Sequence, residues 1–460
     1  MAGPWRGIWC CRDEDAISWR LRPSLAGGQG RCSLELRAPA AWSGGLVEAA
    51  FVLRTPDGRE LAQPLESHGA GNLHVARLAL DAPALWWPHT HGEPSLHQAV
   101  LRTRDAGGAT LDTPLGHVGF RTVTVDRSDG GFAVRVNGER IFCRGAGWTP
   151  LDPVGLRSTP EECLAAVAQV RDAGMNMLRL AGTLPPEEDH FYAACDALGV
   201  LVWQDFPYAS MDYPFDDAGF ADLATRESSQ LAGRLAHHAC LAVLCGNSEV
   251  EQQAAMWGAP RELWQPAFFH QQLPALCADA APGVPYWPSS AHGGSFPHQA
   301  DAGTTSYYGV GAYERGQDDA RRSGLRFATE CLAFANIPGD DALARMPGGL
   351  ATRVHHPQWK ARSPRDLGAG WDFDDVRDHY VQRLFGVDPM RLRHHDPERH
   401  LALGRLATAE LMAAAYAEWR RPASCCDGAL VLMLRDLWAG AGWGVLDDEG
   451  GPKACWHALR

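Results

Sequence analysis

Two glutamates, Glu249 and Glu330, each follow a short apolar run that is typical of a buried strand. The run at residues 241–244 leads to Glu249 through a Cys-Gly-Asn-Ser segment, and the run at 325–329 ends directly at Glu330. Two carboxyl groups on either side of one bond suit glycoside hydrolysis, because one protonates the leaving oxygen while the other attacks the sugar or activates water. The pair therefore predicts a site that cleaves glycosidic bonds, if the fold brings both residues together.

The elements that must position these glutamates form a repeating pattern of strands and helices. Strand candidates begin at residues 141, 175, 200, 241, 284, 304, 325 and 429. Helical patterns at 159–173, 187–198 and 220–237 separate the first four, and Thr159, Pro160 and Glu162 form a capping-box signature. This repetition favours a (β/α)8 TIM barrel over an open, doubly wound sheet. No glycine-rich phosphate or dinucleotide fingerprint follows the first strand.

The first part of the chain has the shorter rhythm of an all-β domain. Alternating runs are separated by turn residues and lie at residues 17–22, 32–37, 46–53, 74–80, 98–103 and 120–125. This spacing predicts an immunoglobulin-like β-sandwich over residues 16–125 and leaves residues 126–460 for the barrel. Asn137-Gly138, between two short apolar runs, predicts a tight hairpin near the start of the second domain.

A barrel of this kind builds its active site at the carboxyl ends of its strands. The ionisable residues expected there are Asp152, Arg179, Asp205, Glu249, Glu330 and Asp436. Aromatic side chains present flat apolar faces on which sugar rings can stack. The aromatic residues expected near the same ends are Trp148, Trp203, Tyr307, Tyr308, Trp438 and Trp443. Residues 348–400, rich in Arg, His, Asp and Trp, are expected to form a long insertion over the mouth of the barrel.

Composition excludes several classes of protein. The chain carries 42 basic and 55 acidic residues, a net charge of −13, so a dedicated nucleic-acid binder is not expected. Neither an apolar run of about 18 residues nor a secretory signal is found, which predicts a cytoplasmic protein without a membrane partner. The 13 cysteines follow no regular framework and no CxxC spacing, so reduced thiols are expected. The histidine pairs lack metal-ligand spacing, and no metal or other cofactor is predicted.

Several short motifs occur along the chain in a characteristic order. They include Leu85-Trp86-Trp87-Pro88, Gly119-Phe120-Arg121, Arg144-Gly145-Ala146-Gly147-Trp148, Asn176-Met177-Leu178-Arg179, Val202-Trp203-Gln204-Asp205-Phe206, Gly246-Asn247-Ser248-Glu249 and Phe327-Ala328-Thr329-Glu330. As a set, and together with a Trp-Gly-Val-Leu-Asp segment near the carboxyl end, they resemble glycoside hydrolase family 2. The resemblance is greatest to the β-mannosidase-like branch of that family and spans residues from about 85 to 460.

The resemblance implies an exo-acting, retaining β-glycosidase that needs no metal. Glu249 would be the general acid/base and Glu330 the nucleophile that forms a covalent glycosyl-enzyme, with the two carboxyl groups about 5–5.5 Å apart. Burial and the nearby charge of Glu330 would raise the pKa of Glu249. Either Tyr307 or Tyr308 would hydrogen-bond the nucleophile. The substrate-binding residues predicted in this way are Asn247, Ser248, Arg179, Asp205, Trp148, Asp152, Tyr307 and Trp438.

Several sugar-contacting positions depart from the family pattern. Ser248 stands where the family usually has an asparagine, and Ser306 stands where it usually has a histidine. Leu180-Ala181-Gly182 replaces a Trp-Gly-Gly motif, and Leu432, Met433 and Arg435 replace Trp, Gln and Asn. Because both glutamates are kept, these changes point to altered sugar specificity more than to lost catalysis.

Alternative functions follow from the same departures. A β-glycosidase for galactose, glucuronic acid or glucosamine is one, and Arg179 or Arg435 would be the residue to examine for an acidic sugar. A truncated, non-catalytic carbohydrate-binding protein is another. Members of the family begin with a sugar-binding jelly-roll domain, and residues 1–15 resemble only its last strand, so a remnant of that domain is expected there.

Overall fold

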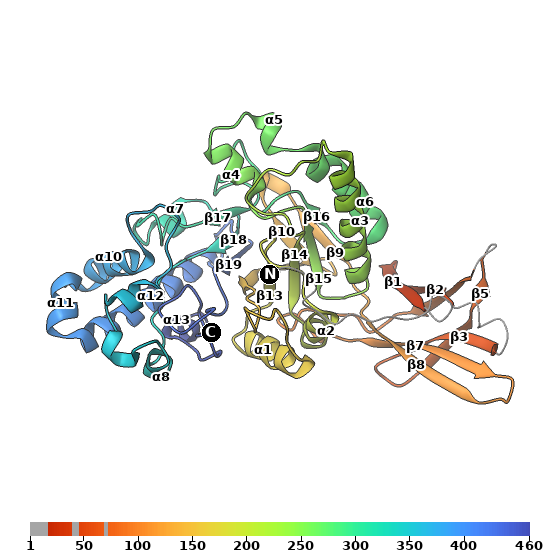
Figure 1. Cartoon of the computed structure of the whole chain (residues 1–460). Helices are drawn as coiled ribbons and strands as arrows, with labels where there is room; N and C mark the ends of the chain where they lie inside the picture. Colours follow the sequence, from red (N-terminus) through yellow and green to blue (C-terminus); the bar gives the residue numbers. More distant parts are fainter. Residues whose placement is uncertain (1–16, 39–45, 69–71) are drawn as a thin grey trace.

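The computed structural model describes residues 17–38, 46–68 and 72–460 of the chain (Figure 1). The predicted jelly-roll remnant at residues 1–15 lies outside these ranges. Two four-stranded antiparallel sheets come first, followed by a small three-stranded sheet and a large eight-stranded parallel sheet with helices around it. No helix within the described ranges is long and apolar enough to cross a membrane.

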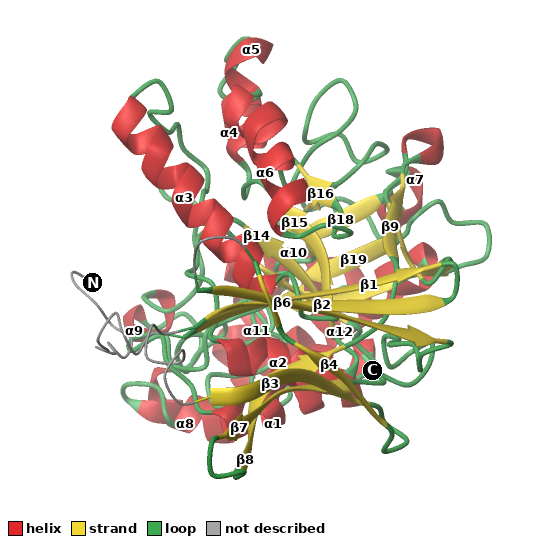
Figure 2. Ribbon diagram, turned by 90° about the vertical axis from the view of Figure 1, so that its right-hand side faces the viewer, coloured by secondary structure: helices red, strands yellow, loops and turns green. Residues whose placement is uncertain are grey.

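The two antiparallel sheets enclose one apolar core and form the predicted β-sandwich (Figure 2). One sheet has the order β1 (Ser18–Ala26), β2 (Gln29–Arg37), β6 (Leu73–Asp81) and β5 (Glu66–Ser67). The other has the order β4 (Glu60–Pro64), β3 (Leu46–Arg54), β7 (His97–Asp105) and β8 (Thr110–Val118). The alternation along β2 places Cys32, Leu34 and Leu36 in the core, as a period of two requires.

Three strands of the sandwich are absent from the sequence-based prediction. They are β4, β5 and β8, and each of them lies at the edge of its sheet. Their residues are mostly exposed. β4 contains Pro64 and β8 contains Pro114, and edge strands tolerate proline better than central strands do. An edge strand needs little apolar alternation, so the pattern that reveals a central strand is weak in all three.

His97 gives the sandwich a pH-dependent stability. It is fully buried at the start of β7, with its ring edge-on to Phe120 at 4.8 Å between centroids. Burial lowers the pKa of His97 from 6.5 to about 4. The unfolded chain therefore takes up a proton at a pH where the folded chain does not. The free energy of unfolding should fall as the pH drops from about 6.5 to about 4, by on the order of 3 kcal/mol in total.

This expectation is tested by urea unfolding of the wild type and a His97→Leu variant between pH 7 and pH 4. The variant should lose less stability over that range than the wild type. His117→Leu is the matched control, because His117 is exposed on the same sandwich, and its pH dependence should follow the wild type. Equal slopes for all three proteins would contradict the assignment to His97.

The eight parallel strands occur in the cyclic order of a TIM barrel. Five strands run from β12 to β16, three run from β17 to β19, and β19 pairs with β12. Their bounds are β12 (Cys143–Gly147), β13 (Met177–Leu180), β14 (Leu201–Asp205), β15 (Leu241–Cys245), β16 (Tyr286–Trp287), β17 (Thr305–Tyr307), β18 (Phe327–Cys331) and β19 (Gly428–Val431). In the described chain the ladder is open only between β16 and β17. The eight strand positions expected from the sequence all correspond to strands of this sheet.

Side chains from distant strands meet inside the sheet, which shows that the sheet is curled. The rings of Trp203 on β14 and Phe327 on β18 lie 5.7 Å apart, and Phe132 contacts both of them and Trp287 on β16. Phe132 lies between the first two strands, in chain order, of the three-stranded sheet, which consists of β9 (Val123–Asp126), β10 (Ala133–Val136) and β11 (Glu139–Ile141). The predicted hairpin joins β10 to β11, with φ of 51° at Asn137 and 87° at Gly138.

Helices follow most barrel strands. They are α1 (Pro160–Asp172), α2 (Asp189–Leu198), α3 (Ala218–Leu235), α4 (Val250–Met256), α5 (Arg261–Trp264), α6 (Leu273–Ala280), α7 (Asp319–Arg322) and α13 (Ala454–Leu459). Helix α1 begins with the predicted capping box between Thr159 and Glu162. The connection from β18 to β19 is much longer and holds α8 (Asp340–Ala344), α9 (Pro357–Lys360), α10 (Phe373–Phe385), α11 (Pro389–His395) and α12 (Pro397–Trp419) (Figure 1).

Candidate active site

A cavity of about 690 Å³ opens at the carboxyl ends of the barrel strands, and Glu249 and Glu330 both line it. Arg179 of β13, Ser248 after β15 and Tyr308 after β17 line the same cavity. The remaining lining is largely apolar and includes Trp148, Leu184, Met256, Tyr313, Trp371, Phe373, Leu432, Met433, Leu437 and Trp443. The two glutamates identified from the sequence therefore share one concave site.

Glu330 lies within β18 and is held by one cation and one phenol. Arg179 donates from Nη1 to Glu330 Oε1 at 2.7 Å, and Tyr308 donates from its hydroxyl to Oε2 at 2.6 Å. The Glu330 side chain is 15% exposed, whereas that of Arg179 is 1% exposed. These two bonds fix the position of Glu330, while one side of its carboxyl group faces the cavity.

The hydrogen-bond partners of the Glu249 carboxyl group within the described ranges are all neutral. Ser306 donates to its Oε1 at 2.7 Å, Gln252 donates to the same oxygen at 3.0 Å, and Gln253 donates to Oε2 at 3.1 Å. Burial raises the pKa of Glu249, and the charge of Glu330 raises it further. The two carboxyl groups therefore have different electrostatic surroundings: that of Glu330 is paired with a guanidinium, whereas that of Glu249 has a raised pKa.

The backbone at Glu249 is unusual. Its φ of 63° lies in the left-handed region, which non-glycine residues seldom occupy, and the residue immediately precedes helix α4. Strained backbone of this kind costs free energy and is concentrated at functional sites. The turn places Glu249 at the start of α4, so that Gln252 and Gln253 on the first turns of that helix reach back to its carboxyl group.

Arg179 connects most of the polar groups beneath the cavity. Its Nη2 donates to Asp205 at 2.7 Å, to Ser248 Oγ at 2.9 Å and to Ser290 Oγ at 2.5 Å. Burial alone would lower the pKa of Arg179, but Asp205 and Glu330 outweigh it and raise that pKa. The guanidinium stays charged and fixes the position of Glu330.

Asp205 and Asn247 lie behind the cavity wall. Asp205 is buried and accepts hydrogen bonds from Arg179 and from Trp203 Nε1, the latter at 2.7 Å. Asn247 is fully buried, donates to the carbonyl of Pro288 and accepts from the backbone of Val250. Neither residue lines the cavity. Both are predicted to bind substrate, and their hydrogen bonds in the structure are to neighbouring residues behind the cavity wall.

Of the two adjacent tyrosines considered as partners of Glu330, Tyr308 is the one that contacts it, and Tyr307 does not line the cavity. Tyr307 points out of the barrel, donates to Asp319 at 2.8 Å and packs against Trp419. Tyr308 is the residue that contacts Glu330. The reason is strand alternation: Ser306 and Tyr308, two residues apart, both face the mouth, whereas Tyr307 between them faces the surrounding helices.

Asp152 and Trp438 lie outside the cavity. Asp152 accepts backbone hydrogen bonds from Val154 and Gly155 at 2.9 Å each and borders a separate hollow with Arg435. Trp438 is half exposed over Arg362 and borders a third hollow. Both residues follow barrel strands, but they lie beyond the part of each loop that lines the cavity, which includes Pro150 after β12 and Leu437 after β19. Trp148 does line the cavity, with its Nε1 bonded to Glu187 at 2.9 Å.

Residues of the long insertion reach the site as expected. Asp366, Trp371 and Phe373 line the cavity, and the Phe373 ring meets Trp443 edge-on at 5.1 Å between centroids. Trp371 and Phe373 were not singled out from the sequence, because nothing in the composition of the insertion shows which of its aromatic residues turn inward. Gln252 and Gln253 were missed as well, although their three- and four-residue spacing from Glu249 on a helix was a usable signal.

Residues 19–121 match the model of glycosyl hydrolases family 2. Beta-mannosidase B of Thermothelomyces thermophilus is 28% identical over all of this chain and 55% of its own length. Beta-mannosidase B of Aspergillus terreus is 29% identical over 84% of this chain and 47% of its own length. The chain thus spans about half the length of the curated relatives it matches.

Solved structures show the same fold. The β-D-mannosidase of Dictyoglomus thermophilum superposes with a TM-score of 0.81 at 23% identity, over 96% of this chain and 54% of that one. An exo-chitosanase of Amycolatopsis orientalis gives a TM-score of 0.69 at 19% identity, over 96% of this chain and 52% of that one. These matches confirm what the sequence motifs indicate: the chain is similar, in sequence and in fold, to glycoside hydrolase family 2 proteins of the β-mannosidase-like branch.

Proposed function

We propose that the chain is a retaining exo-β-glycosidase of the β-mannosidase type, with Glu330 as nucleophile and Glu249 as general acid/base. The observation that carries this proposal is the unequal surroundings of two carboxyl groups in one cavity. Glu330 is paired with the Arg179 guanidinium, whereas Glu249 has only neutral hydrogen-bond partners.

We also propose that residues 16–125 form an immunoglobulin-like domain and residues 126–460 the catalytic barrel.

The proposed reaction has two steps. The Glu330 carboxylate attacks the anomeric carbon while the aglycone oxygen leaves with the proton of Glu249, which gives a glycosyl ester on Glu330. Glu249 then takes a proton from a water molecule as the water oxygen attacks the same carbon, and the ester bond to Glu330 breaks. Two inversions give net retention. The carboxyl separation expected for this reaction is about 5–5.5 Å.

Two buried polar atoms at the cavity support a polyhydroxyl ligand. Trp443 Nε1, a donor, and Gln252 Oε1, an acceptor, have no hydrogen-bond partner within the described chain, and both residues line the cavity. Unpaired buried polar atoms are costly and call for an explanation. Hydroxyl groups of a sugar, which both donate and accept, would satisfy both.

The contacts of the arginines argue against an acidic sugar. Arg435 donates to the backbone carbonyl of Asp448 and borders a different hollow, and Arg179 is already engaged by Asp205 and Glu330. A neutral hexose fits this site better than a uronic acid, because the described residues that line the cavity include no cation other than Arg179 to pair with a third carboxylate. Mannose is the first candidate from the named relatives. Glucosamine is the second, because an exo-chitosanase shares the fold.

The proposal is tested with a panel of aryl β-glycosides that includes mannoside, glucosaminide, galactoside and glucuronide. Turnover of the mannoside, with the β-anomer as the first product seen by ¹H NMR, is the expected result. Turnover of another sugar would keep the mechanism and replace mannose. A folded wild type that cleaves none of them would favour the non-catalytic carbohydrate-binding alternative.

Glu249→Gln should show the signature of a missing acid. On an alkyl glycoside, whose leaving group needs a proton, kcat should fall by about 10²–10⁴-fold. On a dinitrophenyl glycoside the first step should be much less affected, because that leaving group departs without a proton. Equal losses on both substrates would contradict the role of Glu249. With Glu249→Ala, added azide should yield the β-glycosyl azide, because azide then attacks the intermediate from the face that Glu249 occupied.

The adjacent tyrosines provide a matched pair of variants. Tyr308→Phe removes the donor to Glu330 and should lower kcat by about 10²-fold, as loss of one preorganised donor at a reacting oxygen does. Tyr307→Phe removes only the bond to Asp319 and should leave kcat within about twofold while lowering stability by about 1 kcal/mol. The comparison needs steady-state kinetics and urea unfolding of both. Similar kcat values for the two variants would show that Tyr308 does not assist the nucleophile.

A further inference from the structure

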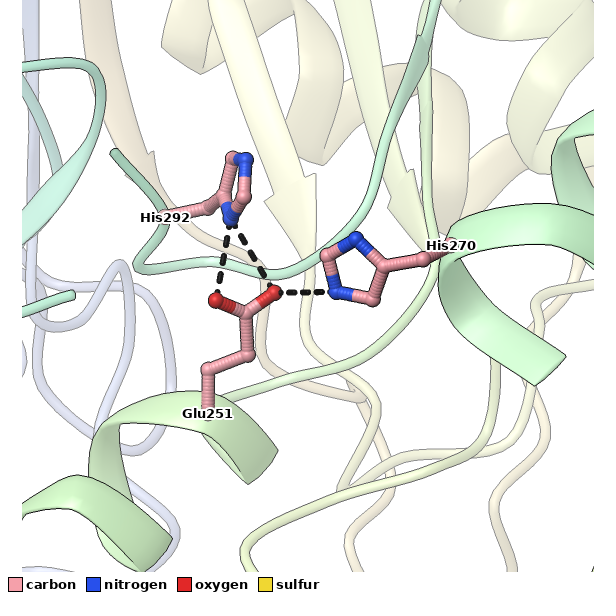
Figure 3. A group of neighbouring side chains, drawn as sticks. All are labelled: Glu251, His270 and His292. Atoms are coloured by element: carbon pink, nitrogen blue, oxygen red, sulfur yellow. Dashed lines mark hydrogen bonds and ion pairs between the residues drawn. The ribbon is translucent and has the colours of Figure 1, made fainter. Parts of the chain in front are cut away.

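Beside the cavity, three side chains from distant segments converge on one point (Figure 3). Glu251 comes from α4, His270 from the π-helical turn Phe268–Gln272, and His292 from the segment that follows β16. His270 Nε2 lies 2.8 Å from Glu251 Oε1, and His292 Nδ1 lies 2.9 Å from Glu251 Oε2. All three ligand atoms lie within 4.8 Å of one another.

We propose that Glu251, His270 and His292 bind a divalent transition-metal ion, of which Zn²⁺ is the best match. Two imidazole nitrogens and one carboxylate form a ligand set that zinc uses with a fourth position left to water. The carboxylate is almost fully buried at 2% side-chain exposure, whereas the imidazoles are 21% and 22% exposed. The carboxylate of the cluster is thus buried, whereas its two imidazoles are partly exposed to solvent.

The distances fit this ion after a small adjustment. Bonds from zinc to nitrogen or oxygen are about 2.0–2.2 Å, so two ligands of a tetrahedral ion lie about 3.3–3.5 Å apart. The nitrogen–oxygen distances of 2.8 and 2.9 Å in the cluster would need to widen by about half an ångström. Side-chain rotations in partly exposed imidazoles can supply that. The π-helical turn that presents His270 is a rare feature that occurs often at functional sites.

The competing interpretation is a pair of hydrogen bonds without a metal. In that case each imidazole carries a proton on the nitrogen that faces Glu251. A metal ion needs the lone pairs of the same two nitrogens, so binding would displace protons and be weaker at low pH. No spacing pattern indicates this cluster, because His270 and His292 lie 19 and 41 residues from Glu251. Ligand-spacing rules recognise closer pairs.

The position of the cluster gives it a consequence for the active site, and this consequence rests on the proposed function. Glu251 is in the same short helix as Gln252 and Gln253, which hold the carboxyl group of Glu249. An ion that ties Glu251 to His270 and His292 would fix that helix to two other segments. Glu251, His270 and His292 would then be positioning residues for Glu249.

The test uses the whole chain, dialysed against a chelator and then titrated with Zn²⁺ or Co²⁺ alone. Calorimetry should give one site of micromolar or tighter affinity. The Co²⁺ form should show visible d–d absorption without the near-ultraviolet charge-transfer band of thiolate ligands, which separates this site from the cysteines. His270→Gln and His292→Gln should each weaken binding at least tenfold. His298→Gln, an exposed neighbour in sequence, should not.

Glu251→Gln keeps the shape of the side chain and should also weaken binding at least tenfold, which covers the case in which a histidine variant fails to fold. Absence of binding to the folded wild type, or binding that survives both Glu251→Gln and His292→Gln, would overturn the proposal. Metal binding is measured without substrate, so its failure is distinct from failure of the glycosidase. Glu330→Gln should bind the metal normally even if it hydrolyses nothing.

Discussion

Replacing Glu330 with glutamine is expected to lower kcat on an aryl β-mannoside, or on whichever aryl β-glycoside the wild type cleaves, by on the order of 10⁴-fold or more. Glutamine keeps the size of the side chain and an acceptor for Arg179, but its amide is a poor nucleophile toward the anomeric carbon. The variant therefore does not form the glycosyl ester, while the packing around Arg179 and Tyr308 changes little. Stopped-assay kinetics at saturating substrate, with thermal unfolding as a check of the fold, give the measurement.

Two controls make the loss specific to Glu330. Glu410→Gln changes an exposed glutamate on α12 and should leave kcat unchanged. Glu330→Ala, which opens space beside the anomeric carbon, should regain turnover with added azide and yield the α-glycosyl azide, because azide then attacks from the face of the nucleophile. A Glu330→Gln variant that keeps more than about a tenth of wild-type kcat would contradict the nucleophile assignment.

Replacing Arg179 with methionine is expected to damage stability and activity together. The guanidinium is 1% exposed and is the cation that faces Asp205 and Glu330 at 2.7 Å each. Removing one partner of a buried ion pair leaves an uncompensated charge and costs about 3–5 kcal/mol of unfolding free energy. Activity should fall below detection, because Glu330 loses the group that fixes its carboxylate. Urea unfolding monitored by circular dichroism gives the stability change.

The double variant Arg179→Met with Asp205→Asn separates the two effects. Removing the Asp205 charge should restore part of the stability, because the double variant has one fewer buried carboxylate without a cation. It should not restore activity. Coupling between the two substitutions is expected because their side chains are in contact. A single Arg179→Met variant with wild-type stability would show that the buried ion pairs contribute nothing net to the folded state.

The barrel could be predicted from the sequence because its strands are buried and apolar. Segments such as Leu241–Cys245 are buried at every position, and they stand out between helices that have their own capping signals. The edge strands β4, β5 and β8 of the sandwich could not be predicted in the same way. Their mostly exposed residues follow no apolar alternation, and only their pairing with β3, β6 and β7 defines them.

The site was predictable where a motif fixes a residue at a strand end, and less so where a loop decides its direction. Glu249, Glu330, Arg179 and Ser248 meet at the cavity as expected. Asp152 also follows a barrel strand, but its loop folds back and its carboxylate binds that loop's own backbone. No local pattern reports such a turn. Pairing between distant segments, as in the cluster around Glu251, is likewise set by the tertiary fold.

Some of the departures from the family pattern lie at the cavity, whereas Arg435 borders a different hollow. Leu432 and Met433 stand at positions where the family usually carries polar or aromatic residues, and both line the site. Ser306 stands at the position of the usual histidine and donates to Glu249. The proposed catalytic pair thus has apolar side chains and short hydroxyl groups around it, which suits a neutral sugar with an aryl or alkyl aglycone. Aryl glycosides are therefore the appropriate first substrates.

The most direct test of the account is to trap the covalent intermediate. The Glu249→Ala variant, incubated with a dinitrophenyl β-glycoside of the sugar that the panel identifies, should accumulate the glycosyl-enzyme, because the second step lacks its base. Acid quenching, digestion and mass spectrometry should find one hexosyl mass on the peptide that contains Glu330, and none when Glu330 is also replaced by glutamine. Hydrolysis that proceeds without any adduct, or with an adduct on another residue, would contradict the claim that Glu330 is the nucleophile of a retaining glycosidase.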